Sequence, residues 1–376
     1  MNNSIDSHNL VKTDEMIEIL TTIVRSAVNN PEDAKVLPAV LLKGPPGCGK
    51  STIVRQIATD LKIGFIDVRL AQMERVDLCG LPSVKDGVTT WNVPDFWPRD
   101  PNSKGIIFFD EITAASSDVQ VASYSLILDR RIPNSGYELP SGWCIIAAGN
   151  RKEDKAVAKT MSSALANRFM HFDLEADPED WTDWAVTHDI HPSVTGYIRW
   201  RPQNLFRMGD QNLEGGWPSP RSWERVSGII PRFSYNEELL RKSVYALIGP
   251  VVGLEFCEFY KINAKMDDVK KMLTDPNAPI IIPEKSDQKY ALCAAISYLL
   301  WNGKDEKEHT LRISGMYRIL MNMSADFATM CVKLCCCGNS KISRFQASAM
   351  IMNNPGYAAF AEKFGSAWTK KYTLDK

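Results

Sequence analysis

Hydrophobic residues in the first half of the chain form short apolar runs that alternate with stretches of helical periodicity. The runs predict strands within VLPAVLLKG (36–44), IGFIDVRL (63–70), GIIFFDE (105–111) and GWCIIAAGN (142–150). The periodic stretches predict helices at DEMIEILTTIVRSAV (14–28), STIVRQIATDL (51–61) and DVQVASYSLILDR (118–130). Short apolar strands separated by helices are typical of an α/β fold, a parallel sheet with helices on both faces.

The pattern changes from about residue 221, where helical periodicity dominates and Pro-rich turns such as TDPNAPIIIPEK (274–285) separate the helices. We therefore predict an α/β domain over residues 1–212 and an all-helical domain over residues 213–376. The residues after 300 are rich in Met, Cys and aromatics and form a C-terminal helical extension in this prediction. Partner recognition and simple enlargement of the helical domain both fit that extension.

The stretch GPPGCGKST joins the first apolar run to the helix predicted after it. It matches G-x-x-x-x-G-K-S/T, the phosphate-loop pattern in which glycines let backbone N–H groups point at phosphate oxygens. Lys50 would reach the β- and γ-phosphates of a nucleotide, and Ser51 would ligate Mg²⁺. A plain Gly-rich turn is the alternative, but a strand before and a helix after are the context the motif requires. The candidate nucleotide-binding residues are Gly44, Pro45, Pro46, Gly47, Cys48, Gly49, Lys50, Ser51 and Thr52.

Two carboxylates follow four apolar residues in IIFFDE (106–111). This pattern predicts a central strand that presents acids at its carboxyl edge, where ligands bind in such sheets. Asp110 would hold Mg²⁺ through water, and Glu111 would orient and polarise a water for attack on the γ-phosphate. A nucleotide kinase needs no water-activating glutamate, so Glu111 favours hydrolysis.

Three further polar residues are candidates, and each has a purely structural alternative. Asn150 ends the run CIIAAGN, where its amide would position the attacking water or would simply occupy a turn. Arg168 in SALANRF would be an arginine finger that stabilises charge on the transferring phosphoryl group, or a surface arginine near a helix end. Arg221 in PSPRSW stands at a predicted helix start after two prolines, where the structural alternative is a solvated first-turn residue.

Taken in order, these segments resemble the AAA+ ATPases, and more narrowly their MoxR-like branch. The resemblance covers roughly residues 10–300 and is carried by VLLKGPPGCGKST, RVDLCGLPSV, GIIFFDEI, DRRIPNSGYELPSGWCIIAAGN, LANRF and WPSPRSW. It implies a P-loop NTPase sheet followed by a helical lid. It also implies Walker A at Gly44–Ser51, Walker B at Asp110–Glu111, sensor 1 at Asn150, an arginine finger at Arg168 and sensor 2 at Arg221.

The resemblance also implies ATP as substrate, Mg²⁺ as cofactor, and a homo-oligomeric ring, commonly a hexamer, in which Arg168 reaches a neighbour's nucleotide. Relatives in this branch often act with a von Willebrand factor A-type partner. Two insertions of the branch are present, one at residues 75–98 and a hairpin at residues 130–142 in which NSG predicts a tight turn. The aromatic residues Trp91, Phe96 and Trp97 of the first insertion favour packing against the core over a grip on substrate.

Composition narrows the range of partners. The 376 residues carry a net charge of −1, which gives no global attraction to nucleic acid or an anionic membrane. YIRWRPQNLFRMGD (197–210) has the Arg–aromatic mixture of a nucleic-acid surface, but we interpret it as a structural connection before the lid. No apolar run reaches the roughly 18 residues that span a bilayer.

Nine scattered cysteines suit a reducing cytosol, so a cytoplasmic protein is expected. The adjacent cysteines 335–337 favour small buried helix residues over a metal site.

The leading hypothesis is an ATP-driven motor that remodels or matures a partner protein. The alternative is a nucleic-acid motor or loader of the same fold, against which the charge balance weighs. A nucleotide-gated switch with little turnover is the third possibility, and the complete hydrolytic set argues against it.

Overall fold

The computed structural model describes residues 9–30, 32–151, 154, 159, 161–208, 215–263 and 266–372. Packing divides the chain into two compact units, Met1–Ala176 and Asp177–Lys376. This division lies before the boundary expected at residue 212, because helices within residues 178–200 pack among the later helices. Gly196 illustrates the packing, since a Cβ at this position would lie 3.2 Å from the Cβ of Ala294.

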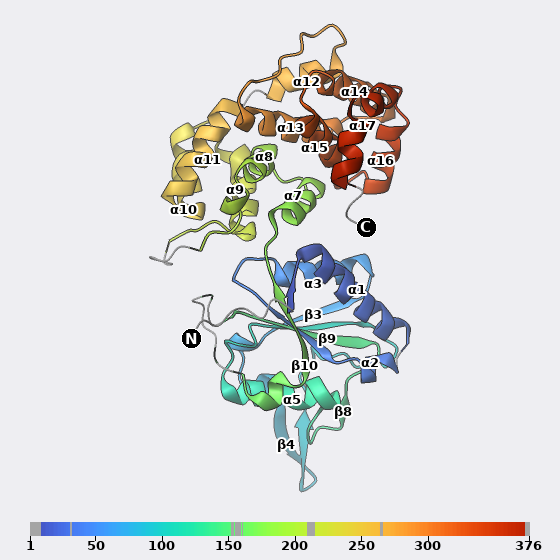
Figure 1. Ribbon diagram of the computed structural model, residues 1–376. Coiled ribbons are helices and arrows are strands. Elements are labelled where there is room, and N and C mark those ends of the chain that lie inside the picture. Colours follow the sequence, from blue (N-terminus) through green and yellow to red (C-terminus); the bar gives the residue numbers. More distant parts are fainter. Residues whose placement is uncertain are drawn as a thin grey trace. The chain divides into compact units, whose positions relative to one another are not determined.

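The first unit contains a six-stranded parallel sheet with the strand order β1-β10-β2-β9-β6-β3 (Figure 1). Its strands are β1 Leu10–Val11, β2 Ala39–Lys43, β3 Gly64–Arg69, β6 Gly105–Asp110, β9 Trp143–Gly149 and β10 Phe169–Leu174. Four of these strands coincide with the four predicted runs. The helices of the unit are α1 Thr13–Asn29, α2 Asp33–Val36, α3 Lys50–Asp60, η2 Leu70–Gln72, α4 Arg75–Cys79, α5 Ser117–Asp129 and α6 Ser163–Ala166.

Helices cover both faces of this sheet, as the alternation predicted. Val40 and Leu42 of β2 point to the face that α1 and α3 cover, and they share one apolar cluster with those helices. Leu41, between them, belongs to the opposite cluster, which includes residues of α5. Because successive side chains of a strand point to opposite faces, a strand buried on both sides must be apolar throughout, as β9 is.

Two hairpins extend from this unit at the two insertions. The first pairs β4 Leu81–Lys85 with β5 Val88–Asn92 through a turn in which Asp86 and Gly87 both have positive φ. The second pairs β7 Arg131–Ile132 with β8 Tyr137–Glu138, which confirms the predicted hairpin. Trp97 is 1% exposed, donates its indole N–H to the carbonyl of Leu78 and packs edge-on against Phe109. The core interpretation is therefore correct for Trp97.

The second unit is all-helical over its described residues (Figure 1). Its helices are α7 Pro178–Thr187, α8 Pro192–Trp200, η4 Pro202–Asn204, α9 Pro220–Phe233, α10 Glu237–Ile248, α11 Pro250–Asn263, α12 Met266–Thr274, α13 Ser286–Leu300, α14 Glu306–Leu320, α15 Ala325–Cys336, α16 Arg344–Met352 and α17 Gly356–Tyr372. Many begin at a residue whose side chain accepts a backbone N–H of the first turn, which satisfies a donor that the helix itself leaves free. Asp177, Ser219 and Asn236 cap α7, α9 and α10 in this way.

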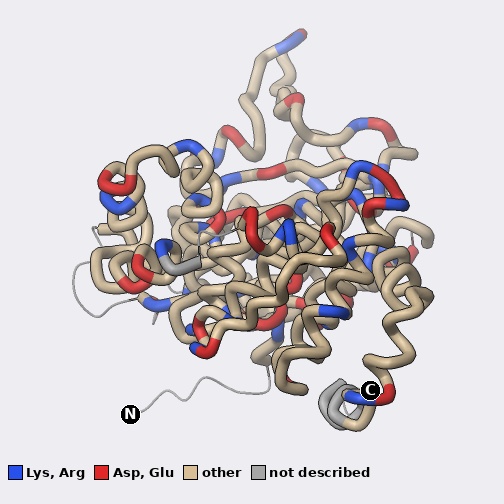
Figure 2. Tube along the Cα trace, turned by 90° about the horizontal axis from the view of Figure 1, so that it is seen from above, with Lys and Arg blue, Asp and Glu red and all other residues tan. Residues whose placement is uncertain are grey.

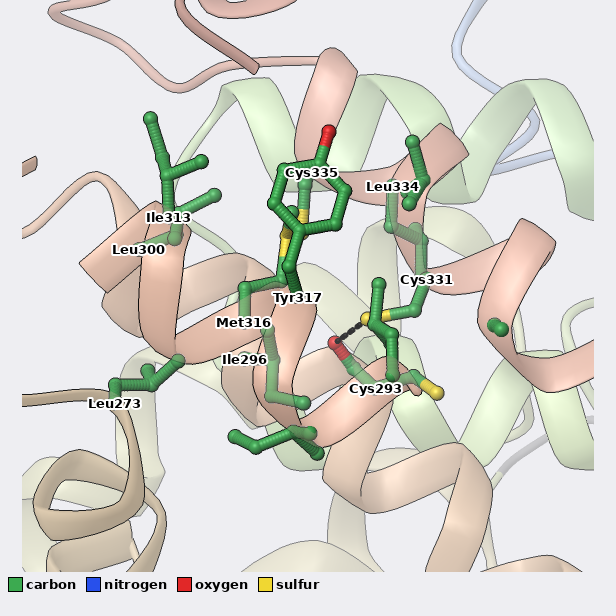
Figure 3. Close-up of a cluster of buried hydrophobic side chains, with 14 of the residues drawn as sticks. Leu273, Cys293, Ile296, Leu300, Ile313, Met316, Tyr317, Cys331, Leu334 and Cys335 are labelled. Atoms are coloured by element: carbon green, nitrogen blue, oxygen red, sulfur yellow. Dashed lines mark hydrogen bonds between the residues drawn. The ribbon is translucent and has the colours of Figure 1, made fainter. Parts of the chain in front are cut away.

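Three cysteines of the second unit belong to one buried apolar cluster. Cys293 of α13 and Cys331 and Cys335 of α15 are fully buried, and Cys331 donates to the carbonyl of Cys293 at 3.9 Å (Figure 3). Burial raises the pKa of the Cys335 thiol. These side chains pack as small apolar residues, as predicted. The described residues form no group of three His, Cys, Asp or Glu side chains with the spacing of a metal site.

Two arginines of the segment 197–210 form ion pairs within the second unit. Arg199 lies 2.5 Å from Asp183, and Arg201 lies 2.8 Å from Glu255 and stacks over Trp200. Both charges are thus balanced inside the unit, which supports the interpretation of this segment as a structural connection.

Charged residues of both signs are interspersed along the described chain (Figure 2). Within the described residues, no helix has the length and apolarity needed to cross a membrane.

Candidate active site

The phosphate loop lies between the carboxyl end of β2 and the first turn of α3. Gly47 and Gly49 have φ values of 80° and 99°, in the left-handed region that glycine adopts without strain. Gly44 needs its hydrogen for a different reason, since a Cβ there would lie 2.8 Å from the carbonyl oxygen of Leu174. The glycines of the motif therefore serve both the curl of the loop and its close contact with β10.

Lys50 is the first residue of α3 and is 8% exposed. Its Nζ donates to the carbonyls of Gly44 at 2.6 Å and Pro45 at 2.9 Å, and to the Oδ1 of Asn150 at 3.3 Å. The ammonium therefore lies across the mouth of the loop and joins it to the end of β9, which is 100 residues further along the chain.

Ser51 and Asp110 are also brought together. The Ser51 hydroxyl donates to Oδ2 of Asp110 at 2.9 Å, across 59 residues of sequence. Asp110 ends β6, and its Oδ1 accepts the backbone N–H of Glu111 at 2.9 Å. A hydroxyl beside a carboxylate is the oxygen-rich donor set that Mg²⁺ prefers, so these two side chains fit that ion.

Glu111 follows directly, is exposed and has a φ of 56°. A non-glycine residue in the left-handed region costs roughly 1–2 kcal/mol, and such strain concentrates at functional sites. The sharp turn places the two adjacent carboxylates in different surroundings: Asp110 bonds to Ser51, while Glu111 faces solvent.

Asn150 is anchored by a residue that sequence reasoning missed. Thr113 is 6% exposed, and its Oγ1 accepts the Asn150 backbone N–H at 3.0 Å and donates to the Asn150 carbonyl at 3.3 Å. Gly149 permits this contact, because a Cβ there would lie 2.5 Å from Thr113 Cγ2. A threonine two residues after the acid pair was the only available signal, and such a residue is common in turns.

Arg168 lies in the same unit but makes different contacts. Its guanidinium lies over the Tyr124 ring, 4.9 Å from the centroid, and donates to the carbonyl of Ala164. Neither residue belongs to the group formed by Lys50, Ser51, Asp110 and Asn150. Arg221 is exposed at the second position of α9 and belongs to the second unit. The structure thus brings together four of the predicted polar residues, with Glu111 adjacent to them.

Comparison with known proteins agrees with this site. The family model described as "AAA domain (dynein-related subfamily)" matches residues 39–169, which include every predicted site residue except Arg221. Protein NorQ of Paracoccus denitrificans is 33% identical over 190 residues, a match that covers 47% of this chain and 68% of NorQ. Denitrification regulatory protein NirQ of Stutzerimonas stutzeri is 27% identical over 183 residues, covering 46% of this chain and 66% of NirQ.

Among solved structures, a mutant of Thermotoga maritima RuvB is 17% identical, covering 76% of this chain and 84% of RuvB, with a TM-score of 0.33. The sequence matches, the parallel sheet and the phosphate loop carry the assignment: this chain belongs to the AAA+ ATPases, in their MoxR-like branch.

Proposed function

We propose that this chain hydrolyses ATP with Mg²⁺ and uses the energy, as a ring of identical subunits, to remodel or mature a partner protein. The observation that carries the proposal is the convergence of Lys50, Asn150, Ser51 and Asp110 at the carboxyl edge of the sheet. Three places distant in sequence supply these polar groups, the first turn of α3, the end of β6 and the end of β9, and packing alone gives no reason for them to meet.

Each group has a role that follows from its chemistry. Lys50 already holds three oxygen acceptors, and the β- and γ-phosphates would replace some of them when a nucleotide binds. Ser51 and Asp110 would hold Mg²⁺, which supplies positive charge to the phosphate oxygens when bound. Glu111 would accept the proton of the attacking water, and the Asn150 amide would orient that water beside the γ-phosphate.

Ring assembly, commonly hexameric in this family, would supply what the single subunit lacks. Arg168 contacts Tyr124 and Ala164 of its own subunit, so we propose that it completes a neighbour's site rather than its own. Arg221 would contact the nucleotide as the lid's contribution. A protein with a von Willebrand factor A-type domain is the partner we propose, and the cytoplasm is the proposed compartment.

Glu111→Gln tests hydrolysis, with Glu18→Gln as the matched control because Glu18 is an exposed glutamate of the same unit, on α1. We expect Glu111→Gln to bind a fluorescent ATP analogue normally and to release phosphate about 10²–10⁴-fold more slowly. Lys50→Ala should instead lose the analogue, because no phosphate contact replaces its ammonium. Normal turnover in Glu111→Gln would remove it from the catalytic role. Turnover that depends on single-stranded DNA would favour the nucleic-acid motor.

Mixing experiments test the ring. Arg168→Ala and Lys50→Ala should each be inactive, whereas mixed rings should regain activity where an intact Lys50 site meets an intact Arg168. Specific activity of the unmodified protein should also rise with its concentration, since assembly obeys mass action. Inactive mixtures whose mixed composition is confirmed by native mass spectrometry would show that Arg168 does not act between subunits.

A further inference from the structure

Arg151, the residue after Asn150, contacts the last two residues of β10. Arg151 lies with its Nε 3.1 Å from Oδ1 of Asp173, and its Nη2 donates to the carbonyl of Leu174 at 2.9 Å. The side chains of Arg151 and Asp173 are only 13% and 18% exposed. Taking two charges out of water to this extent carries a desolvation cost, so the pair is weak evidence for stability as such.

The same carbonyl also faces the phosphate loop. The Leu174 oxygen that accepts from Arg151 lies where a Cβ on Gly44 would be only 2.8 Å away. Gly44 in turn donates its N–H to the carbonyl of Gly149 at 3.3 Å. The start of the phosphate loop, the end of β9 and the end of β10 are thus joined at one place, and Arg151 is the side chain that spans the last two.

Asn150 is therefore held from two sides. Thr113 binds its backbone N–H and carbonyl, and Arg151 anchors the following residue to Asp173 and Leu174. An amide that must orient a water needs both anchors, because a displacement of about 1 Å can cost on the order of 10²-fold in rate. The Arg151 backbone N–H also donates to Oδ2 of Asp154 at 2.9 Å, but that contact is local, whereas the Arg151 side chain ties the chain after Asn150 to a different strand, β10.

We propose that Arg151 is a positioning residue for ATP hydrolysis, which fixes the Asn150 amide relative to Lys50 by binding Asp173 and the Leu174 carbonyl. The proposal rests on the proposed function in that turnover is its main readout. It assigns Arg151 no contact with the nucleotide. Its removal is expected to lower kcat and to leave nucleotide affinity nearly unchanged.

Three variants separate the contributions. Arg151→Ala removes both interactions. Arg151→Lys keeps the charge near Asp173 but lacks the planar fork whose Nε and Nη2 reach the two acceptors in their present geometry. Asp173→Asn keeps an oxygen acceptor and removes the charge. Arg55→Ala is the matched control, since Arg55 makes an ion pair of 3.0 Å with Asp67 of β3, the strand at the sheet edge opposite β1.

We expect kcat to fall about 10–100-fold in Arg151→Ala, with KM and analogue affinity within about threefold of the unmodified protein. Arg151→Lys and Asp173→Asn should lie between these extremes, and Arg55→Ala should keep full turnover. A merely structural role would lower the active fraction and the melting temperature without this split between kcat and KM. Unchanged kcat in folded Arg151→Ala, or a loss confined to KM, would overturn the proposal.

Amide hydrogen exchange keeps the test independent of turnover. In the nucleotide-free protein, the backbone N–H of Asn150 should exchange at least ~10-fold faster in Arg151→Ala, while the backbone N–H of Ile107 in β6 should be unaffected. If the unmodified protein hydrolyses no ATP, the proposed function fails, yet this comparison still decides whether Arg151 positions Asn150. Equal exchange of the Asn150 amide in both proteins would refute the positioning role. Should Arg151→Ala fail to fold, Arg151→Lys and Asp173→Asn carry both measurements.

Discussion

Gly149→Ala is a one-methyl change beside the site that should damage it. Gly149 ends β9 directly before Asn150, and an added Cβ would lie 2.5 Å from Cγ2 and 2.7 Å from Oγ1 of Thr113. Such separations are well inside van der Waals contact, so one of the two residues must move. The problem is purely one of space, because φ at this position lies outside the left-handed region.

The cost can be worked out from what Thr113 does. Its side chain is 6% exposed and has little room to retreat, and forcing an extra methyl into a packed site costs typically about 1–3 kcal/mol. A displaced Thr113 would also lose its two hydrogen bonds to Asn150, worth about 1 kcal/mol each. We therefore expect the free energy of unfolding to fall by ~3–5 kcal/mol. Turnover should fall roughly 10²-fold as the Asn150 amide moves.

Urea denaturation and steady-state phosphate release measure the two effects. Thr113→Ala is the matched variant, because it removes the hydrogen bonds without creating a clash. In the double variant the added methyl meets only the Cβ of residue 113, at 3.1 Å, so the double variant should be only slightly less stable than Thr113→Ala alone. The losses of the single variants should thus be strongly non-additive. Losses that add within about 0.5 kcal/mol would show that Thr113 is not the obstacle. Normal turnover in folded Gly149→Ala would show that the position of Asn150 does not limit hydrolysis.

Two further predictions concern stability. Trp97→Ala should lower the free energy of unfolding by about 3–5 kcal/mol in urea denaturation, because it empties a fully buried site, whereas the partly exposed Trp91 should tolerate alanine with a clearly smaller loss. Equal losses would contradict the core placement of Trp97. Burial lowers the pKa of His191 from 6.5 to about 4, so the unfolded chain binds a proton more readily than the folded one, and stability should fall as pH drops through this window. His191→Asn, which keeps an N-cap acceptor for α8, should remove up to ~2 kcal/mol of destabilisation between about pH 7 and pH 5, and an unchanged pH slope would refute the assignment.

Three of the four predicted strands are almost completely buried, while β3 was predicted from its apolar residues although only Val68 in it is buried. The runs that became β2, β6 and β9 are apolar nearly throughout, because helices cover both faces of the sheet there. β1 was missed because a two-residue strand leaves no periodic signal. β10 was missed because its sequence, FMHFDL, mixes polar and apolar residues, and its strand conformation depends on pairing with β2, which lies about 130 residues earlier in the chain.

Site residues were predictable where the chemistry is local. The phosphate loop and the acid pair of Asp110 and Glu111 are contiguous motifs, so their residues lie close together in space because they are adjacent in the sequence. The bond between Lys50 and Asn150 spans 100 residues, and only the parallel strand order brings those ends to one edge. Thr113 offered only a weak signal and Arg151 none, since neither belongs to a motif and each makes its contacts with residues distant in sequence.

The failure at β10 has a chemical cause that bears on the site. Asp173 interrupts the apolar pattern of that strand one residue before its end, and a carboxylate whose side chain is only 18% exposed needs a partner to offset its desolvation. The partner is Arg151, the residue after Asn150. Sequences depart from local patterning where function requires it. Asp173, which breaks the apolar pattern of β10, is also the residue that we propose fixes Arg151 and with it the chain after Asn150. Replacing both members of the pair by apolar residues should therefore leave the fold nearly as stable while lowering turnover, a separation that a purely structural ion pair would not produce.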